Sequence, residues 1–468
     1  MLGALKYYLK QGLKQGLRRA SDTFASRTAR QLPPGYWGLA AHPQRGLTLG
    51  NVALHELLER HGSPLLVLDI QALKRNARQF VGDGTGGGLE VFYSYKTNPV
   101  AFSLSTLHQQ GVGAEVISAY ELWLALRLGV PADRIVYNGP VKSEASMRDA
   151  IARDIGLITA NHAEELDGLA RIAAEMGKRP RTGIRVSMSQ GWSGQFGVPA
   201  GEALQAFSRA RSLASLDVRA LHAHRGGMIG SEAELTALVT EVLGLSDLLA
   251  DRLGIELSIL DFGGSLGTPS VGYPTATQRR LNRTLLRDLP APDVTAALGI
   301  ERYVSILTMM VGEHFARVSR PRPRIFVEPG RSMTSNTQLL LTTVHALKGA
   351  GDRTYAIMDG GINIAEPTRG EYHQLLAVNR INEPPSRVYT VVGPICTPAD
   401  TLYPAARLPE LSVGDSLCIM DAGAYFVPFA TSFSYPQPAI VALDGDREIL
   451  VRRAEQFEDM AARDIVRV

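Results

Sequence analysis

The chain has little cysteine and no long apolar run, and both absences narrow its class. Cys396 and Cys418 are the only cysteines among 468 residues, which is too few for a disulfide framework. We therefore expect a reducing, cytoplasmic location. No run of 18 or more apolar residues is present, so we expect no transmembrane helix. No group of cysteines and histidines has metal-ligand spacing, and we expect no metal site.

The chain also lacks an excess of either charge. It has 49 Lys and Arg residues against 46 Asp and Glu residues, which gives a formal net charge of +3. A balance this close to zero gives no reason to expect a nucleic-acid partner. Hydrophobic residues make up 45% of the chain, a fraction that is typical of a globular enzyme.

Only the N-terminus departs from this balance. Residues 1–30 contain several Lys and Arg residues but a single acid, Asp22, and leucine recurs at every fourth position from Leu5 to Leu17. We predict a basic amphipathic extension over residues 1–45. Three roles are open: binding to a membrane surface or a partner, an organelle transit segment, or a helix that packs its leucines on its own protein.

Eight short apolar runs that end in polar or glycine-rich turns alternate with helix-like stretches. The expected strands are 91–96, 113–118, 135–140, 157–161, 183–187, 220–225, 257–265 and 324–331. The expected helices between them include 119–128, 163–176 and 232–253. Strands that alternate with helices pair in parallel, and eight repeats predict an α/β fold with a closed (β/α)8 barrel over residues 68–336. The interval from about 268 to 322 is too long for one helix and indicates an insertion.

The pattern changes after about residue 336 to alternating apolar and polar positions with Pro and Gly turns. Such runs are 339–347, 354–358, 387–392, 416–420 and 439–443. They predict a C-terminal antiparallel β-domain over residues 337–468, to which residues 46–67 contribute.

Lys96 stands at the end of the first expected barrel strand, just before the chain-breaking pair Asn98-Pro99. A lysine held rigidly at a strand end and partly removed from water favours the neutral amine, which can form a Schiff base with an aldehyde. A solvated lysine is the ordinary alternative. The carboxyl ends of barrel strands form the active-site face, so the polar and glycine residues that end the other strands are expected to converge with Lys96.

Seven short motifs occur in the order found in one enzyme family. They lie at 92–96, 113–118, 222–227, 260–264, 328–331, 393–396 with Asp400, and 421–425. With these motifs the chain resembles the fold-type III pyridoxal-phosphate decarboxylases, the family of diaminopimelate, ornithine and arginine decarboxylases. The resemblance covers about residues 50–460. It implies an alanine-racemase-like barrel with a β-domain, pyridoxal 5'-phosphate as the cofactor, and a homodimer with active sites at the interface.

The resemblance implies roles for residues of the barrel. Lys96 corresponds to the lysine that carries the cofactor, and His224 to the histidine that stacks on its ring. Glu328 corresponds to the carboxylate that pairs with the pyridine nitrogen. The phosphate is expected to contact Gly263, Gly264, Ser265, Gly330 and Arg331, and Arg331 is also a candidate for binding a substrate carboxylate. A structural histidine at 224 and a salt bridge between Glu328 and Arg331 are the ordinary alternatives.

The resemblance also implies roles for residues of the β-domain. Cys396 corresponds to the cysteine that reaches the partner subunit's active site and protonates the carbanion after CO2 leaves. Tyr425 corresponds to a tyrosine near the phosphate and the substrate, and a core tyrosine is its alternative. Thr397 stands where these decarboxylases carry an acid that binds the distal ammonium group of the substrate.

Other departures lie in the same recognition segments. The family pattern Arg-Pro-x-Leu-Tyr is Glu366-Pro367-Thr368-Arg369-Gly370 in this chain, so its arginine and its tyrosine are both missing. The cofactor residues are kept while the substrate residues differ. We therefore expect an atypical substrate, either an amino acid or an aminoacyl intermediate tethered to a carrier.

Three alternative functions remain. A fold-type III racemase or epimerase also uses the lysine, but it lacks the segment around Cys396. Diaminopimelate decarboxylase proper conflicts with Thr397. A non-catalytic regulator conflicts with the presence of both Lys96 and Cys396. We predict a carboxy-lyase that acts on amino acids in biosynthesis.

Overall fold

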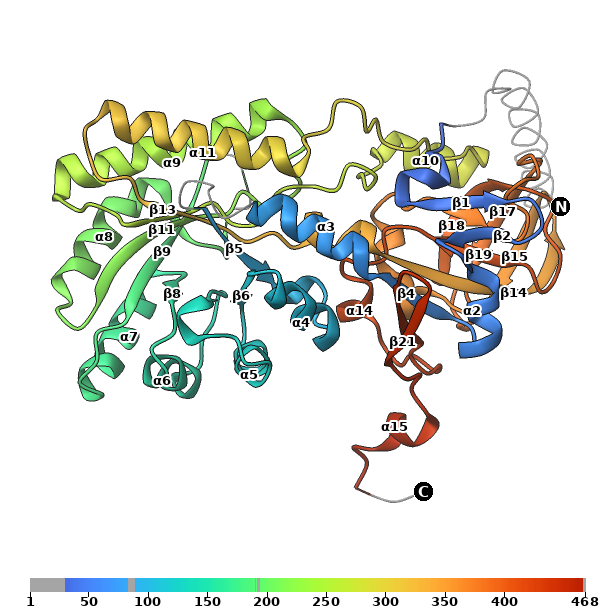
Figure 1. Cartoon of the computed structure of the whole chain (residues 1–468), viewed down its shortest axis with the longest axis horizontal. Coiled ribbons are helices and arrows are strands. Elements are labelled where there is room, and N and C mark those ends of the chain that lie inside the picture. Colours follow the sequence, from blue (N-terminus) through green and yellow to red (C-terminus); the bar gives the residue numbers. More distant parts are fainter. Residues whose placement is uncertain (1–29, 83–88, 190, 192–193, 466–468) are drawn as a thin grey trace, which may run out of the picture. The chain divides into compact units, whose positions relative to one another are not determined.

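The computed structural model describes residues 30–82, 89–189, 191 and 194–465, and the chain divides into two compact units (Figure 1). The barrel unit contains Gln71–Pro269 and Thr295–Ser335. The β unit contains the described residues up to Ile70, Ser270–Val294 and the chain from Asn336 onward. Among the described residues, no helix combines the length and apolar character needed to cross a membrane.

Eight parallel strands of the described chain close into the barrel. They are β5 (Leu89–Ser94), β6 (Gly113–Val116), β7 (Ile135–Tyr137), β8 (Leu157–Ala160), β9 (Arg181–Ser187), β11 (Asp217–Ala223), β12 (Ile259–Asp261) and β13 (Arg324–Val327). Pairing of β13 with β5 and of β8 with β9 completes the ring. The short strand β10 (Val198–Pro199) is added beside β9. The predicted (β/α)8 barrel is confirmed, and each of the eight predicted runs overlaps one strand.

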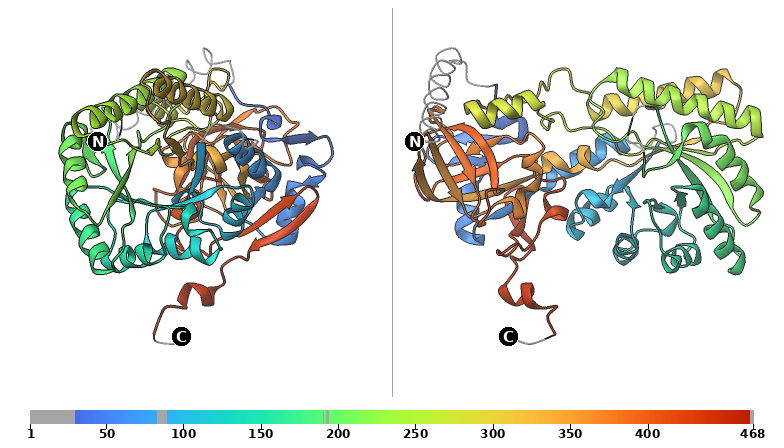
Figure 2. Two further views of the ribbon diagram at one scale, coloured as in Figure 1. Left: turned by 60° about the vertical axis from the view of Figure 1, so that its left-hand side comes forward. Right: turned by 180° about the vertical axis from the view of Figure 1, so that it is seen from behind.

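Helices surround these strands, as the two views of Figure 2 show. They are α3 (Ile70–Val81), α4 (Ala101–Gln109), α5 (Ala119–Arg127), α6 (Glu144–Ala152), α7 (Ala163–Glu175), α8 (Ala203–Ser212), α9 (Glu232–Leu253), α11 (Ile300–Arg317) and the single turn α12 (Arg331–Thr334). Several begin where the sequence supplies a capping side chain. The hydroxyls of Ser118, Ser143 and Ser231 accept backbone N–H groups at the starts of α5, α6 and α9.

The lower part of the barrel interior is apolar. Its buried cluster consists of Phe92, Val136, Leu157, Ala220, Ile259 and Phe326. Gly113 and Gly183 complete this layer, because a Cβ atom at Gly113 would collide with the Phe92 ring and one at Gly183 would press on Ala220. The two bulky rings therefore fill the space that the glycines leave, and this packing closes the barrel below the strand ends.

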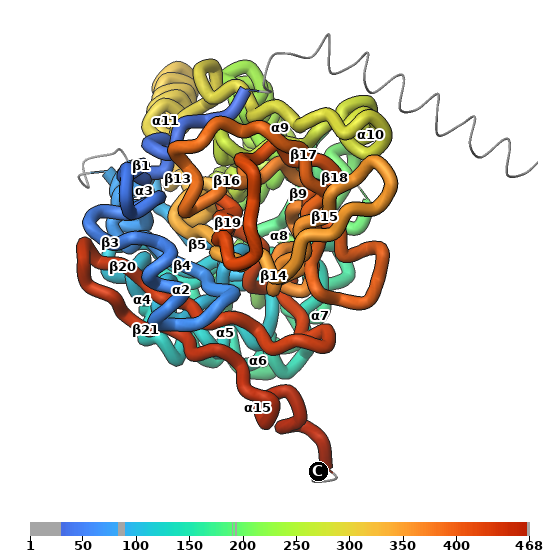
Figure 3. Tube along the Cα trace, turned by 90° about the vertical axis from the view of Figure 1, so that its right-hand side faces the viewer, coloured from blue at the N-terminus to red at the C-terminus, as the bar shows by residue number. Residues whose placement is uncertain are grey.

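The β unit is built on a large sheet with the strand order β18-β17-β15-β14-β4-β20-β21 (Figure 3). Its strands are β4 (Leu65–Asp69), β14 (Gln338–Ala350), β15 (Arg353–Met358), β16 (Leu375–Ala377), β17 (Arg387–Val392), β18 (Thr401–Leu408), β19 (Ser416–Ile419), β20 (Ala439–Asp444) and β21 (Arg447–Arg452). Strand β19 pairs with both β14 and β16. The expectation of an antiparallel domain needs one correction, because β15 pairs with β17 and β20 pairs with β4 in parallel.

The first described residues belong to the β unit, so the predicted extension over 1–45 is too long. They form β1 (Leu39–His42), β2 (Gly46–Leu49), β3 (Val52–Ala53) and α2 (Leu54–His61), after a 3-10 turn at Pro34–Trp37. Leu32, Trp37 and Leu39 are buried in the core of this unit. The predicted amphipathic helix lies on residues 1–29, which are outside the described residues.

The predicted insertion at 268–322 serves both units. Its second half contains α11, which packs against α9 in the barrel unit. Its first half, Ser270–Val294, belongs to the β unit and contains α10 (Ala276–Leu285). The remaining short helices of the β unit are α13 (Ile362–Ala365), the 3-10 turn η6 (Glu366–Arg369), α14 (Phe426–Phe429) and α15 (Phe457–Ala461).

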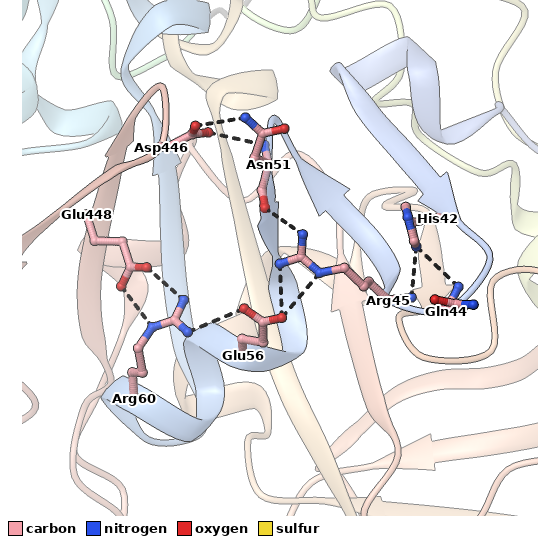
Figure 4. Close-up of polar contacts among 8 residues, drawn as sticks. All are labelled: His42, Gln44, Arg45, Asn51, Glu56, Arg60, Asp446 and Glu448. Atoms are coloured by element: carbon pink, nitrogen blue, oxygen red, sulfur yellow. Dashed lines mark hydrogen bonds and ion pairs between the residues drawn. The ribbon is translucent and has the colours of Figure 1, made fainter.

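Polar contacts at the surface join the start of the β unit to its C-terminal hairpin (Figure 4). The Arg60 guanidinium donates to Glu448 at 2.7 Å, and the Asn51 side-chain amide donates to Asp446 at 2.8 Å. Arg45 and Arg60 both reach the carboxylate of Glu56. These groups are partly exposed, so their contribution to stability is small and they mainly fix the position of α2 on the hairpin.

A buried ion pair in the barrel unit joins the segments that follow β7 and β8. The Lys142 ammonium is fully buried and donates to Glu165 at 2.9 Å and to the Thr159 carbonyl at 2.7 Å. The second oxygen of Glu165 accepts the Asn161 N–H at 2.7 Å. Burial lowers the pKa of Lys142 despite the carboxylate beside it. The pair is therefore costly to desolvate and depends on both partners being present.

We expect Lys142→Met to lower the free energy of unfolding by about 3–5 kcal/mol, because it leaves the Glu165 carboxylate buried without its cation. Urea unfolding followed by circular dichroism measures the change. Lys178→Met is the matched control, since it removes an exposed pair with Asp154 and is expected to leave the unfolding midpoint almost unchanged. Equal midpoints for Lys142→Met and the wild type would contradict the prediction.

Candidate active site

Each strand of the barrel places one polar side chain at its carboxyl end. Side chains of a strand alternate between the two faces, so the residue two positions beyond each apolar interior residue also points inward. These positions are Ser94, Glu115, Asn138, Thr159, Arg185, His222, Asp261 and Glu328. We call this group the polar layer. It lies directly above the apolar layer that closes the barrel.

Hydrogen bonds connect the polar layer across the strands. The Asn138 amide donates to Glu115 at 3.1 Å and to Glu328 at 2.5 Å. The Ser94 hydroxyl donates to the other oxygen of Glu115 at 2.5 Å. Lys96 lies in the 3-10 turn η2 (Tyr95–Thr97) just after β5, with its ammonium 3.8 Å from the same Glu115 oxygen. Glu115 thus links the predicted cofactor lysine to the carboxyl group of Glu328 through Asn138.

Two carboxyl groups of this layer, those of Glu328 and Asp261, hold protons more tightly than carboxyl groups in water. Burial, reinforced by the nearby Asp261 and Glu115, raises the pKa of Glu328 well above its usual range. Burial also raises the pKa of Asp261 to about 6. The nearest cations are Lys96 and Arg185, and each lies close enough to favour the charged form of one of these acids. A cationic ring nitrogen placed against Glu328 would do the same.

Two histidines of β11 and the turn after it face this group. Burial, together with the charges of Lys96 and Arg185, lowers the pKa of both His222 and His224 well below the usual value. The His222 Nε2 atom lies 3.5 Å from Glu328, and His224 Nδ1 accepts the Gly264 N–H at 3.3 Å. Both rings are therefore neutral at physiological pH, and a neutral ring can lie flat against another aromatic ring without charge repulsion.

His222, His224 and Glu328 also bring their N and O atoms within 4.8 Å of one another, which is close enough for a shared metal ion. The cysteine and histidine spacing of the sequence did not point to this group.

Three glycines line the mouth of the barrel where side chains cannot fit. A Cβ atom at Gly263 would overlap the His224 ring, one at Gly264 would overlap the Glu328 carbonyl, and one at Gly330 would overlap the Thr97 hydroxyl. Gly263 also has a φ of +61°, in the left-handed region that favours glycine. Glycine is therefore required at these turns, because the backbone packs directly against His224, Glu328 and Thr97 and leaves no space for a Cβ atom.

The other predicted phosphate contacts flank these glycines. Ser265 is buried and its hydroxyl accepts the Gly226 N–H at 3.1 Å. Arg331 is 8% exposed and begins α12, and its carbonyl accepts from the Thr268 hydroxyl at 3.1 Å. The barrel unit thus brings the predicted lysine, histidine, glutamate and glycine positions to one face.

The remaining predicted site residues belong to the β unit. Cys396 is exposed in the loop after β17. The Asp400 carboxylate fixes this loop by accepting the N–H groups of Ile395 at 2.7 Å and Ile362 at 2.8 Å. The Thr397 hydroxyl accepts the Ala399 N–H at 3.3 Å.

Tyr425 of the β unit has a positive φ of +69° at the start of α14. Its ring is stacked 5.7 Å from that of Phe429. A backbone conformation of this kind is uncommon for a residue with a side chain and marks a position that the surrounding structure holds firmly.

Asn138 and Arg185 were missed by the sequence reasoning, and Glu115 and Asp261 were noticed only as parts of motifs. A detectable signal existed in the alternation along each strand. A polar residue two positions after a buried apolar residue, at the end of an expected barrel strand, marks an inward-facing position. Thr159, Asn138 and Arg185 all satisfy this rule.

The barrel unit brings a lysine, a neutral histidine, a buried glutamate and glycine turns to one face. Together with a β domain, this arrangement defines a class of pyridoxal-phosphate enzymes. The family model described as "Pyridoxal-dependent decarboxylase, pyridoxal binding domain" matches residues 69–335, and the chain belongs to this family. Two similar proteins are the diaminopimelate decarboxylases of Archaeoglobus fulgidus and Aquifex aeolicus, each 29% identical. Their alignments cover 88% of this chain and 96% and 94% of those proteins.

Solved structures agree with this assignment. Diaminopimelate decarboxylase from Helicobacter pylori complexed with L-lysine is 26% identical, with a TM-score of 0.73 over 87% of this chain and 98% of that chain. Diaminopimelate decarboxylase from Methanocaldococcus jannaschii has the same fold, with a TM-score of 0.80 over 92% and 98% of the two chains at 23% identity. The chain is a pyridoxal-phosphate-dependent amino-acid decarboxylase.

The residues present fit this cofactor. An aldehyde needs an amine, and Lys96 supplies it. A phosphate can be held by backbone N–H groups of glycine turns, and Gly263, Gly264 and Gly330 lie in turns just after β12 and β13. A protonated pyridine nitrogen needs a carboxylate beside it, and Glu328 is buried at the barrel mouth, where a cationic ring nitrogen would favour its charged form.

We expect Glu328→Gln to stabilise the cofactor-free protein, and more at pH 8 than at pH 5. Because the pKa of Glu328 is raised on folding, the folded protein binds more protons than the unfolded chain above about pH 4.3. Stability therefore falls as the pH rises, until the folded carboxyl group ionises. Glutamine has no carboxyl group to ionise, so the variant does not lose stability in this way. Its side-chain oxygen can still accept a hydrogen bond from Asn138.

Urea unfolding of the cofactor-free protein at both pH values measures the difference. Glu175→Gln, which alters an exposed carboxylate on α7, is the control and should leave the pH dependence unchanged. A Glu328→Gln protein with the same pH dependence as the wild type would contradict the proposed burial of a protonated carboxyl group.

Proposed function

We propose that this enzyme removes the α-carboxylate of an amino acid whose distal end differs from that of diaminopimelate. The observation that carries the proposal is Thr397 after Cys396, where the decarboxylases that the chain resembles have an acid. Bound pyridoxal phosphate supplies an electron sink for the electron pair that remains when CO2 leaves. The residues of the chain bind this cofactor, orient the substrate and move protons.

In this proposal the barrel unit holds the cofactor. Lys96 forms the covalent attachment, and Glu115 beside it keeps the amine in place through an ionic contact of 3.8 Å. Glu328 would pair as a carboxylate with the protonated ring nitrogen, positioned by its hydrogen bond from Asn138. His224 lies against the ring as a neutral imidazole. Gly263, Gly264, Ser265, Gly330 and Arg331 surround the phosphate.

Cys396 is the proposed general acid that returns a proton to the α-carbon. Its thiol is exposed on a loop that Asp400 holds in one conformation, which suits a group that must approach a substrate bound elsewhere. We further propose that the enzyme is a homodimer in which Cys396 completes the active site of the partner subunit, and that Tyr425 lies near the phosphate and the substrate. A fixed loop gives the proton donor a defined position, and general acid catalysis requires that position.

We expect mixtures of Lys96→Ala and Cys396→Ala proteins to recover activity that neither variant has alone. Lys96→Ala loses the covalent attachment, and Cys396→Ala slows decarboxylation by about 10²–10⁴-fold because the general acid is lost. Subunit exchange creates some sites in which both residues are intact. Release of CO2 after mixing and incubation measures the recovery.

Borohydride treatment is the control for this experiment, because it should fix the cofactor to Lys96 in Cys396→Ala protein and not in Lys96→Ala protein. If exchange is demonstrated with differently tagged subunits and activity does not return, the shared active site is wrong.

The departures in the recognition segments support a different distal group on the substrate. Thr397 provides a hydroxyl and no charge. Glu366 is 3.9 Å from Arg369, so the segment retains one guanidinium but at a different position from the arginine of the family pattern. Gly370 provides no ring. We propose that the substrate has no free distal ammonium group, as in an aminoacyl group tethered to a carrier or to a larger intermediate.

We expect the wild-type enzyme to release CO2 from meso-diaminopimelate and from ornithine only slowly. A site built to pair a distal ammonium group discriminates strongly against substrates that lack it, and a site without the carboxylate gains nothing from that group. A screen of free and acylated amino acids for CO2 release, with the holoenzyme, identifies the preferred class.

A double variant, Thr397→Glu with Glu366→Arg, tests whether these two departures cause the slow turnover of meso-diaminopimelate. It should raise kcat/KM for meso-diaminopimelate by about tenfold or more, which corresponds to about 1.4 kcal/mol of recovered interaction. Rapid turnover of free meso-diaminopimelate by the wild type would refute the proposed substrate class.

A further inference from the structure

The β unit contains a pocket beside the recognition segment. It is lined by one face of α10, by the end of η6 and the segment after it, and by β18, and encloses about 70 Å³. A volume of this size has room for about five heavy atoms. Its floor is formed by the buried residues Asn282, Tyr372, Gln374 and Leu402.

The wall formed by α10 is held rigidly. The buried Asn282 amide donates to the Ala405 carbonyl of β18 at 3.0 Å and to the Arg287 carbonyl at 2.7 Å. Arg353 of β15 donates to the Arg283 carbonyl at 2.6 Å. At the other end of the helix, Thr275 and Gln278 form a capping box. Figure 3 shows α10 beside β18.

The pocket carries more positive than negative charge. Four guanidinium groups line it, against the carboxyl groups of two acids, and these six residues are Arg279, Arg283, Arg369, Arg407, Asp288 and Glu371. Both acids already have partners in this unit. The Asp288 carboxylate accepts a hydrogen bond from the backbone N–H of Arg407 at 2.8 Å, and the Glu371 carboxylate lies 3.3 Å from the His373 ring. Burial raises the pKa of Asp288 to about 6, which weakens its ability to neutralise the arginines at lower pH.

Arg279 and Arg283 are one helical turn apart and both face the pocket. Within the described part of the chain, neither guanidinium has a hydrogen bond or an ion pair. Like charges at this spacing destabilise a helix by a few tenths of a kcal/mol, and α10 contains no acid that offsets the repulsion. A pair of unpartnered guanidinium groups on a rigid wall is suited to an anion that both can bind.

We propose that this pocket is a binding site for a doubly charged oxyanion on a small molecule. Each planar guanidinium can donate two parallel hydrogen bonds to oxygen atoms of one phosphate group or of two neighbouring carboxylates. The pocket volume matches a group of this size. The site depends on α10, which belongs to the insertion between β12 and α11, and it does not depend on the proposed substrate of the enzyme.

Isothermal titration of the full-length holoenzyme tests the proposal, with inorganic phosphate and malonate as the two probes. Bound pyridoxal phosphate keeps the cofactor site closed to both. We expect saturable binding of at least one probe. Arg279→Gln and Arg283→Gln should each weaken it by about tenfold, and raising the salt concentration should weaken it further. Preference for phosphate identifies a phosphate ester as the ligand class, and preference for malonate identifies a dicarboxylate.

Arg280→Gln is the matched control, because Arg280 lies on the same helix and does not line the pocket. It makes the same change of charge and should alter binding by less than about twofold. Glutamine keeps the helix propensity of arginine, and unchanged circular dichroism and melting temperature verify that each variant is folded. Absence of saturable binding, unchanged binding in Arg283→Gln, or an equal loss in Arg280→Gln would each overturn the proposal.

Discussion

Removal of three carboxyl groups from water at the mouth of one barrel is the constraint on which the rest of the site depends. Glu115, Asp261 and Glu328 come from three different strands and are all buried. A fold that buries three carboxyl groups is stable only if protons, cations or hydrogen-bond donors offset the cost of removing them from water. Asn138 and Ser94 are the donors, and Lys96 and Arg185 are the cations. A cofactor with a ring nitrogen and an aldehyde completes this arrangement from the open side.

The local sequence pattern determined much of the fold. The eight barrel strands and helices such as α9 were predicted closely, because each is specified by periodicity and end signals within a few residues. The pairings of the β unit were not predictable in this way. The parallel pairing of β20 with β4 joins residues from opposite ends of the chain, and the edge strand β18 carries Pro404 in its interior, which weakens its strand signal.

The candidate site shows the same division. Lys96, His224 and Glu328 were accessible from the sequence because short motifs surround them. Arg185 and Asn138 have no such motif, and only the register of neighbouring strands brings them to the same layer. The extent of the N-terminal segment was misjudged for a related reason. The burial of Trp37 and Leu39 depends on partners in β4, β14 and β20, and a local pattern contains no information on them.

Compared with the family motifs, the chain keeps the residues expected at the cofactor and departs at those expected at the substrate. Most of the residues proposed to hold the cofactor lie at the ends of barrel strands or in the turns that follow them, where the register of the sheet limits their positions. Groups of the recognition segments lie on short turns of the β unit, such as η6 and the loop after β17, where a substitution changes a side chain without moving a strand. This separation would allow the reaction to be kept while the specificity changes as proposed. The helix α10, inserted into one connection of the barrel, adds a further surface to the β unit without altering the barrel strands.

The path of the chain has a consequence for folding during translation. Strand β4 is made early, yet its two neighbours β14 and β20 are made only after the entire barrel. During translation β4 must wait with both edges unpaired, and the barrel is the first part that can fold to completion. A chain released before Ala439 would retain β4 with one bare edge, which is the kind of edge that pairs with other chains. Strand β20, near the end of the chain, thus covers the edge of β4 that would otherwise be open to such pairing.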